Sequence, residues 1–424
     1  MREWGLPAEI PVRSGDPSQC QGSSLPNVTN IVGVPRESFP GERCVAITPR
    51  SCEVLQKANM TVLVEPSAGA DAGYPDEQYT VRGAKLASRA EIFQQANIIA
   101  QFRSLGANPE AGRADLGHFR SGQIVIGLGE PLTAQREVSD LAASGVSFFA
   151  LELIPRITRA QSMDVLSSLA TISGYEAVLL AAAALPKLFP MLMTAAGTIT
   201  PAKVFVLGAG VAGLQAIATA KRLGAVVSAY DVRTAVKDQI VSVGAKFVSL
   251  DVEAATAEDK GGYAKAMDES FYQRQRQLMT EVVREQDVVI TTAAVPGKRA
   301  PVLVTTPMVE AMAPGSVVVD LAAVRGGNCE LTKPGESIVH NGVHVLGPLN
   351  FPALAPYHSS QMFSTNVTTF LKHLTGLLPL TASPADEIVR DTLVTFGGAI
   401  VNTRVCETFG LPAATKAVNN GNVK

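Results

Sequence analysis

The chain has 424 residues, of which 46% are hydrophobic and 17% charged, and its formal net charge is −2. This length exceeds what one hydrophobic core supports, so we expect two domains, and the composition is globular rather than disordered. The near-neutral charge and the lack of a basic stripe argue against nucleic acid as a partner. Five scattered cysteines without metal-type spacing favour a reducing compartment and predict no metal site.

Neither the N-terminal segment nor any apolar run predicts a leader or a membrane span. Residues 1–29 lack an apolar signal core and contain Glu3, Glu9 and Asp16, so we interpret them as a flexible extension. No apolar run approaches the ~20 residues of a membrane helix. The best candidate, residues 177–185, stops at Pro186 and is interpreted as a buried helix. We therefore expect a soluble chain.

Residues 30–165 alternate short apolar runs with helical segments. The alternation predicts an open α/β domain, a parallel sheet with helices on both faces. Its strands are expected in NIVGVP (from Asn30), TVLVEP (from Thr61), ANIIAQF (from Ala96) and GQIVIGLG (from Gly122), with a helix over residues 50–58.

A polar loop over residues 156–167 precedes a long helical pattern that crosses into a second domain, residues 166–349. We expect this helix to begin near Met163 and to be interrupted at Gly174 and Pro186. Six strands, expected near 204–207, 226–230, 246–250, 287–293, 316–321 and 343–347, fit a doubly wound parallel sheet.

The second domain opens with a glycine-rich turn between a buried strand and a helix, KVFVLGAGVAGLQ from Lys203. Gly208 allows the tight turn, Gly210 lets backbone approach a pyrophosphate, and Gly213 lets the helix pack close to the strand. Asp231 ends the next strand about 20 residues on, where a carboxylate binds an adenosine ribose. A plain glycine turn is the alternative, but strand, helix and acid together favour NAD. The carboxylate would repel the 2′-phosphate of NADP, an argument that Arg233 slightly weakens.

Three later segments complete the expected organisation. Residues 251–268 form an unusually long polar connection, either a solvent insertion or a mobile flap, and Gly261, Gly262 and Tyr263 favour the flap. A helix within 348–374 is expected to return to the first domain, through residues 350–380. Residues 381–424 are expected to hold a hairpin, with its turn at Gly397-Gly398, and a loose tail.

No acid–base catalyst is evident beside the predicted cofactor site. None of the five histidines lies in the glycine loop, at the acidic strand end or in the 156–167 loop. That loop instead carries hydrogen-bonding side chains: Arg156, Arg159, Gln161, Ser162, Asp164 and Ser167. They suit the binding of an amide or sugar, although Ser162 or Asp164 capping a helix is the structural alternative. Hydride transfer between two nicotinamides moves no proton at the reacting carbons and needs only positioning.

Five stretches together resemble the NAD(H)-binding domain I of proton-translocating transhydrogenases. They are RITRAQSMDVLSS, the glycine motif extended to Arg233, GGYAKAMDESF, TTAAVPGKRAPVLV and GSVVVDLAAVRGGNCELTKPGE. The resemblance spans residues 30–375 and implies two Rossmann-like domains with a cleft between them, a homodimer and bound NAD(H). It further implies direct hydride transfer to NADP(H) on domain III of a partner chain, coupled to proton movement through membrane domain II. The chain would then be cytoplasmic and peripheral on the inner membrane, or on its matrix side in a eukaryote.

The resemblance also assigns residues. Arg156 and Asp164 would fix the nicotinamide carboxamide, Gln161 would bridge the two nicotinamide riboses, and Ser167 would support the loop; Gln161, Arg156 and Asp164 form the expected catalytic set. The remaining expected cofactor contacts are Gly208, Gly210, Val211, Gly213, Asp231, Val232, Gly262, Tyr263, Thr292 and Ala293.

Two alternatives remain open. Alanine dehydrogenase is similar in fold, but it uses a lysine and a histidine where this chain has Gln101 and Gly129 or Glu130. A non-catalytic NAD-binding module is the other.

Overall fold

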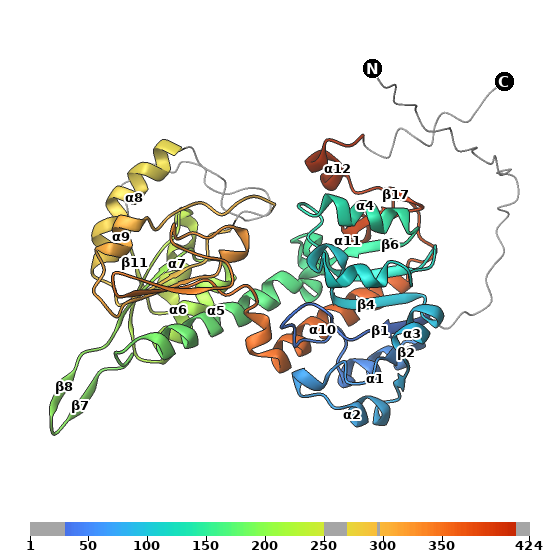
Figure 1. Cartoon of the computed structure of the whole chain (residues 1–424), viewed down its shortest axis with the longest axis horizontal. Helices are drawn as coiled ribbons and strands as arrows, with labels where there is room; N and C mark the ends of the chain where they lie inside the picture. Colours follow the sequence, from blue (N-terminus) through green and yellow to red (C-terminus); the bar gives the residue numbers. More distant parts are fainter. Residues whose placement is uncertain (1–29, 250–268, 295–296, 413–424) are drawn as a thin grey trace, which may run out of the picture.

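The computed structural model describes residues 30–249, 269–294 and 297–412. Two sheets form the centres of two lobes, and helix α5 (Val165–Ala184) runs from one lobe to the other (Figure 1). The flap expected over residues 251–268, with Gly262 and Tyr263, lies outside the described residues.

The first lobe is built on an eight-stranded sheet in the order β17-β16-β6-β5-β4-β1-β2-β3. The six strands from β6 to β3 are parallel; β1, β2, β4 and β5 are the four predicted strands, whereas β3 and β6 were not predicted. The β16–β17 hairpin adds two antiparallel strands beside β6. The hairpin turns at Gly397 and Gly398, whose φ angles of 57° and 86° favour glycine. The strands are β1 (Asn30–Val34), β2 (Met60–Val64), β3 (Lys85–Leu86), β4 (Ile98–Arg103), β5 (Ile124–Leu128), β6 (Ser147–Ala150), β16 (Leu393–Phe396) and β17 (Ala399–Ile400).

Helices cover both faces of this sheet, and its central strands are buried apolar runs, as is typical of a parallel sheet. The helix expected to return to this lobe is α10 (Pro356–Thr375). Its Phe363 and Phe370 pack against Phe102 and Phe149 of the sheet, with ring centroids 4.4 and 5.6 Å apart. The other helices are α1 (Pro49–Lys57), α2 (Asp76–Val81), α3 (Arg89–Gln95), α4 (Gln135–Ala143), α11 (Glu387–Thr392) and α12 (Thr403–Phe409).

The second lobe contains a seven-stranded sheet in the order β11-β10-β9-β12-β13-β15-β14. The six predicted strands are confirmed, and their order is that of the doubly wound dinucleotide fold, in which the strand order reverses between β9 and β12. A seventh strand, β14, pairs antiparallel with β15 and was not predicted. The strands are β9 (Lys203–Leu207), β10 (Val226–Tyr230), β11 (Lys246–Phe247), β12 (Val288–Thr291), β13 (Val317–Asp320), β14 (Ser337–His340) and β15 (Val343–Leu346); the helices are α6 (Val211–Arg222), α7 (Lys237–Ser242), α8 (Glu269–Arg284) and α9 (Thr306–Glu310).

Helix α5 corrects one expectation: it continues through Gly174 and ends at Ala184, just before Pro186. A Cβ on Gly174 would lie 2.1 Å from the carbonyl oxygen of Ala212. The glycine therefore lets α5 pack closely on α6 rather than breaking the helix. By length and composition α5 is also apolar enough to cross a bilayer, contrary to the expectation that no segment is, although here it packs between α6 and α10.

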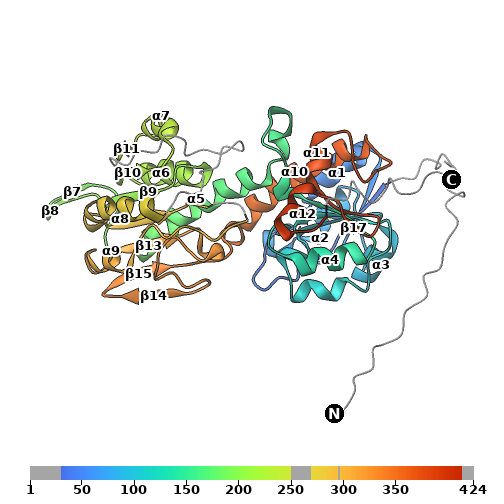
Figure 2. The same ribbon diagram turned by 90° about the horizontal axis from the view of Figure 1, so that it is seen from above.

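Two short strands, β7 (Leu192–Thr194) and β8 (Gly197–Ile199), form a hairpin of their own that the sequence analysis did not predict. Both views show it projecting from the second lobe, away from the first (Figures 1 and 2).

Candidate nucleotide site and interlobe cleft

The three glycines after β9 have three different surroundings. Gly208 has a φ of +97°, the left-handed conformation that a tight turn requires. A Cβ on Gly213 would lie 1.9 Å from the carbonyl oxygen of Gly208, so α6 can approach the turn only with glycine there. Among the described residues no heavy atom lies within 4 Å of a Cβ built on Gly210. The space beside Gly210 is therefore open to a ligand.

Helix α6 begins directly at this turn, with Gly210 as its N-cap and Val211 as its first residue. The first N–H groups of a helix have no partner within it, and its dipole favours negative charge. The open side of Gly210 and the start of α6 together form a site suited to a phosphate.

Asp231 follows β10 and fixes the glycine turn, a role that the sequence analysis missed. Its carboxylate accepts hydrogen bonds from the Ala209 N–H at 2.7 Å and from the Arg233 N–H at 2.8 Å. The Arg233 guanidinium pairs with both carboxylate oxygens, at 3.0 and 2.9 Å. A cation thus accompanies the acid at the strand end where a ribose is expected.

Thr292 and Ala293 border the same turn from the end of β12. The Thr292 hydroxyl donates to the Gly208 carbonyl at 3.1 Å, and buried Asn328 accepts the Ala293 N–H at 3.0 Å. The structure therefore brings Gly208, Gly213, Asp231, Thr292 and Ala293 together at the point where the strand order of the sheet reverses.

A cavity of about 1460 Å³ lies between the lobes and contains two of the expected catalytic residues, Arg156 and Asp164, in its lining. The first lobe contributes the carboxyl ends of β4, β5 and β6, and the second contributes Ala294, Gly297 and Arg325. An ion pair between Glu130 and Arg325 joins the two sides. Within the described part of the chain, Gln161 and the glycine turn lie outside this lining.

The 156–167 loop is a 3₁₀ segment, η6 (Thr158–Met163), followed by the N-cap of α5. Asp164 is that cap: its carboxylate accepts the Ser167 N–H at 2.9 Å and the Ser167 hydroxyl at 2.6 Å. The capping alternative is therefore observed, and it coincides with a position in the cavity wall. Gln161 is exposed to solvent.

Glu152 is a half-buried acid in the cavity wall that the sequence analysis did not single out. Its Oε1 accepts the N–H groups of Gly129 and Glu130 at 2.8 and 2.6 Å, and its Oε2 has no hydrogen-bond partner among the described residues. Burial, followed by the nearby Glu130 charge, raises the pKa of Glu152 to about 7. Its position after β6, at the carboxyl end of a parallel strand, was the available signal.

The positions expected to hold a lysine and a histidine in an alanine-type site have other roles. Gln101 is buried and donates to Asp115 at 3.1 Å, and Glu130 pairs with Arg325. Neither position supplies a cation or a general acid of the alanine dehydrogenase kind.

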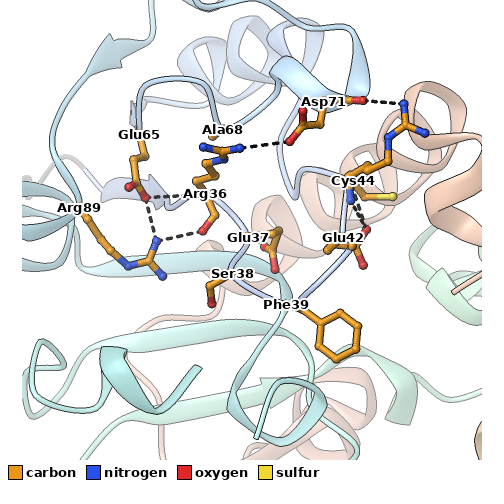
Figure 3. A pocket seen from close by; sticks show the side chains of 12 residues that line it. Arg36, Glu37, Ser38, Phe39, Glu42, Cys44, Glu65, Ala68, Asp71 and Arg89 are labelled. Atoms are coloured by element: carbon orange, nitrogen blue, oxygen red, sulfur yellow. Dashed lines mark hydrogen bonds and ion pairs between the residues drawn. The ribbon is translucent and has the colours of Figure 1, made fainter. Parts of the chain in front are cut away.

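A smaller pocket of about 650 Å³ lies in the first lobe, beside the segment that follows β1 (Figure 3). Its charged groups are bonded to one another: Arg89 contacts Glu65 at 2.8 Å and Arg36 contacts Asp71 at 3.2 Å. Glu37 accepts the N–H groups of Phe102 and Arg103. These contacts tie β1 to β4 and indicate a structural pocket.

A lobe with the dinucleotide-binding strand order, joined across a cleft to a second parallel α/β lobe, defines a two-domain Rossmann-like protein. The N-terminal domain of alanine dehydrogenase/PNT matches residues 33–173, and the C-terminal domain of alanine dehydrogenase/PNT matches residues 177–403. The chain therefore belongs to the alanine dehydrogenase/PNT family.

The similar proteins include transhydrogenase subunits and alanine dehydrogenases. An NAD(P) transhydrogenase subunit alpha chain of Rhodospirillum rubrum is 44% identical over 375 residues, 88% of this chain and 97% of the relative. Alanine dehydrogenase of Mycobacterium tuberculosis is 27% identical over 391 residues, 90% of this chain and 97% of the relative. The crystal structure of transhydrogenase from Sinorhizobium meliloti has a TM-score of 0.77 and 41% identity, covering 88% of this chain and 99% of that one.

Proposed function

We propose that the chain is the NAD(H)-binding subunit of a proton-translocating transhydrogenase. It would hold NADH on the second lobe and pass hydride directly to NADP on domain III of a partner chain. The observation that carries this proposal is the placement of Arg156 and Asp164 in the wall of the interlobe cavity. The similarity to relatives named as transhydrogenase subunits supports it.

The site residues would act by binding and orientation. The start of α6 and the open side of Gly210 would hold the pyrophosphate, with Val211 beside it. Asp231, with Val232 next to it, would hold the adenosine ribose, and Thr292 and Ala293 would border the nucleotide. Arg156 and Asp164 would fix the carboxamide, with Ser167 bonded to Asp164. Gly262 and Tyr263 would contact the nucleotide from the 251–268 connection.

Gln161 would lie at the junction with domain III and bridge the two nicotinamide riboses. Its exposure to solvent supports this, because a residue that meets a partner-bound nucleotide must be accessible. The nicotinamide supplies the hydride, and the chain's own groups align the two rings without moving a proton at the reacting carbons.

The assembly would include a second copy of this chain, an NADP(H)-binding domain III and a membrane domain II. The subunit would then be peripheral on the inner face of the inner membrane. The apolar side chains exposed along the β7–β8 hairpin support a contact with the second copy.

The decisive experiment mixes the chain with NADP-loaded domain III and follows hydride transfer at fixed NADH. We expect NADP reduction only when both proteins are present. Transfer that requires alanine would favour the dehydrogenase alternative. NADH binding without any transfer would favour a non-catalytic module.

Gln161→Asn tests the proposed role of the loop. Shortening the side chain by one methylene should slow hydride transfer far more than it weakens NADH binding, because the role is positioning between two nucleotides. Equal losses would make Gln161 an ordinary ligand contact.

A further inference from the structure

The loop that carries Gln161, Thr158–Met163, is attached to the first lobe by more than its neighbours in sequence. Ala160 and Met163, on either side of Gln161, are buried in the core of that lobe. Gln161 and Ser162 between them are exposed. The two apolar residues anchor the loop in the core of the lobe. The exposed residues between them are held in place by polar contacts.

One polar contact comes from α10. The Asn366 side chain, buried in the middle of this 20-residue helix, donates from Nδ2 to the carbonyl oxygen of Ser162 at 2.8 Å. Ser162 directly follows Gln161, so this bond fixes the peptide between Ser162 and Met163, one residue beyond the exposed glutamine. Phe363 and Phe370 anchor the helix on either side of Asn366 in the sheet core.

A second polar contact comes from Asp386, the N-cap of α11. Its Oδ2 accepts a hydrogen bond from the Arg159 guanidinium at 2.7 Å, two residues before Gln161. Its Oδ1 lies 3.0 Å from Nε2 of His373 on α10 and 3.0 Å from the Val389 N–H. Burial opposes ionisation, but the hydrogen bonds from His373, Arg159 and Val389 together hold the pKa of Asp386 well below its usual value.

We infer that Asn366 and Asp386 are positioning residues for hydride transfer, acting through the geometry of Gln161. Both residues lie more than 200 positions later in the chain, and they bond the loop before and after Gln161, at Arg159 and Ser162. Neither residue is among the expected nucleotide contacts. This inference rests on the proposed role of Gln161 and adds the groups that hold it in place.

The test measures NADH affinity and single-turnover hydride transfer to NADP-loaded domain III for the full chain. Asn366→Leu removes the amide donor at similar volume, and we expect transfer to slow by about tenfold or more while the NADH Kd changes less than about twofold. Asn97→Leu is the matched control, because Asn97 bonds Ile31 and Asn30 at the opposite ends of the strands. It should leave the transfer rate per folded molecule unchanged.

The ion pair is tested by conservative rescue. Arg159→Gln should slow transfer, whereas Arg159→Lys, which keeps a cation within reach of Asp386, should recover most of the rate. Lys57→Gln, which removes the cation of a surface ion pair with Glu53 on α1, serves as the control for a generic loss of positive charge. Equal rates for Arg159→Gln and Arg159→Lys would overturn the role of Asp386.

A double-mutant cycle separates this inference from the proposed function. If Asn366 acts through Gln161, Asn366→Leu should have little further effect on transfer in the Gln161→Asn background. Additive effects, or a parallel loss of NADH affinity, would overturn the inference while leaving the function intact. A normal transfer rate in Gln161→Asn alone would instead remove the proposed role of Gln161.

Discussion

At the residue scale, two glycines after β9 have different surroundings, one suited to close packing of the fold and the other to an approaching ligand. Gly213 faces the Gly208 carbonyl oxygen, a backbone atom that cannot rotate away, whereas Gly210 faces open space. An added methyl group therefore meets the protein at one position and would meet the ligand at the other.

Gly213→Ala should accordingly lower the stability of the fold, whereas Gly210→Ala should lower the affinity for NADH. Overpacking against backbone should cost Gly213→Ala about 2 kcal/mol of unfolding free energy or more. Gly210→Ala should change stability by less than about 1 kcal/mol but weaken NADH binding by about tenfold or more. Urea unfolding and NADH fluorescence titration measure the two quantities. A Gly210→Ala protein with unchanged NADH affinity would contradict a pyrophosphate beside this glycine.

Glu152 should make stability depend on pH. Its folded-state pKa of about 7 lies above the ordinary value of 4.5. Between these two pH values the folded state therefore holds a proton that the unfolded chain has lost. The unfolding free energy should therefore fall as pH rises from about 4.5 to about 7. Glu152→Gln keeps the Oε1 acceptor but cannot titrate. Its unfolding free energy should therefore change by about 1–3 kcal/mol less than that of the unsubstituted protein across this pH range. Urea unfolding of both proteins at pH 5 and pH 8 provides the comparison, and identical slopes would mean that Glu152 does not titrate there.

At the element scale, the approach of α5 to α6 determines how the connecting helix packs on the second lobe. Gly174 permits this approach, since a Cβ there would lie 2.1 Å from the Ala212 carbonyl oxygen. The two helices share many contacts, and α5 also contacts β13.

Gly174→Ala should therefore destabilise the protein although alanine is the better helix former. The propensity gain is about 1 kcal/mol, while overpacking against backbone costs about 1–3 kcal/mol. Gly376→Ala at the end of α10 is the matched control, because its Cβ would lie at ordinary contact distance, 3.5 Å, from the nearest atom. Thermal unfolding distinguishes the two; a Tm in Gly174→Ala equal to or above that of Gly376→Ala would contradict the close packing.

The elements differ in how far sequence predicts them. Most of the buried parallel strands were found because each is a continuous apolar run bounded by glycine or polar residues, but β6, a four-residue run that begins at Ser147, was missed. The signal for α3 was present as Ser88 followed by Glu91, which form a capping box, but it was not used. Helix α4 has no side-chain cap at Ala134, and β3 has two residues, so neither has a strong local signal.

At the scale of the whole molecule, sequence order predicted the fold better than the site. The glycine turn, the acid after β10 and the end of β12 are local features that parallel sheet geometry brings together. The contacts of Arg159 with Asp386 and of Asn366 with Ser162 link segments far apart in sequence. No local pattern encodes them, because they depend on how α10 returns to the first lobe.

The β7–β8 hairpin should also act at the scale of the assembly. An isolated two-stranded hairpin is marginal in water, yet this one exposes Met191, Leu192, Met193 and Ile199. A second copy of the chain would bury these side chains.

Met193→Glu should therefore shift the proposed dimer toward monomer. The Met193 side chain is 82% exposed, and placing a carboxylate in an apolar contact costs several kcal/mol unless the charge is paired. Val81→Glu is the matched control, since Val81 is 86% exposed on α2 in the other lobe. Sedimentation velocity at several protein concentrations measures the dimer fraction. A dimer that survives Met193→Glu as well as Val81→Glu would show that the hairpin is not the contact between copies.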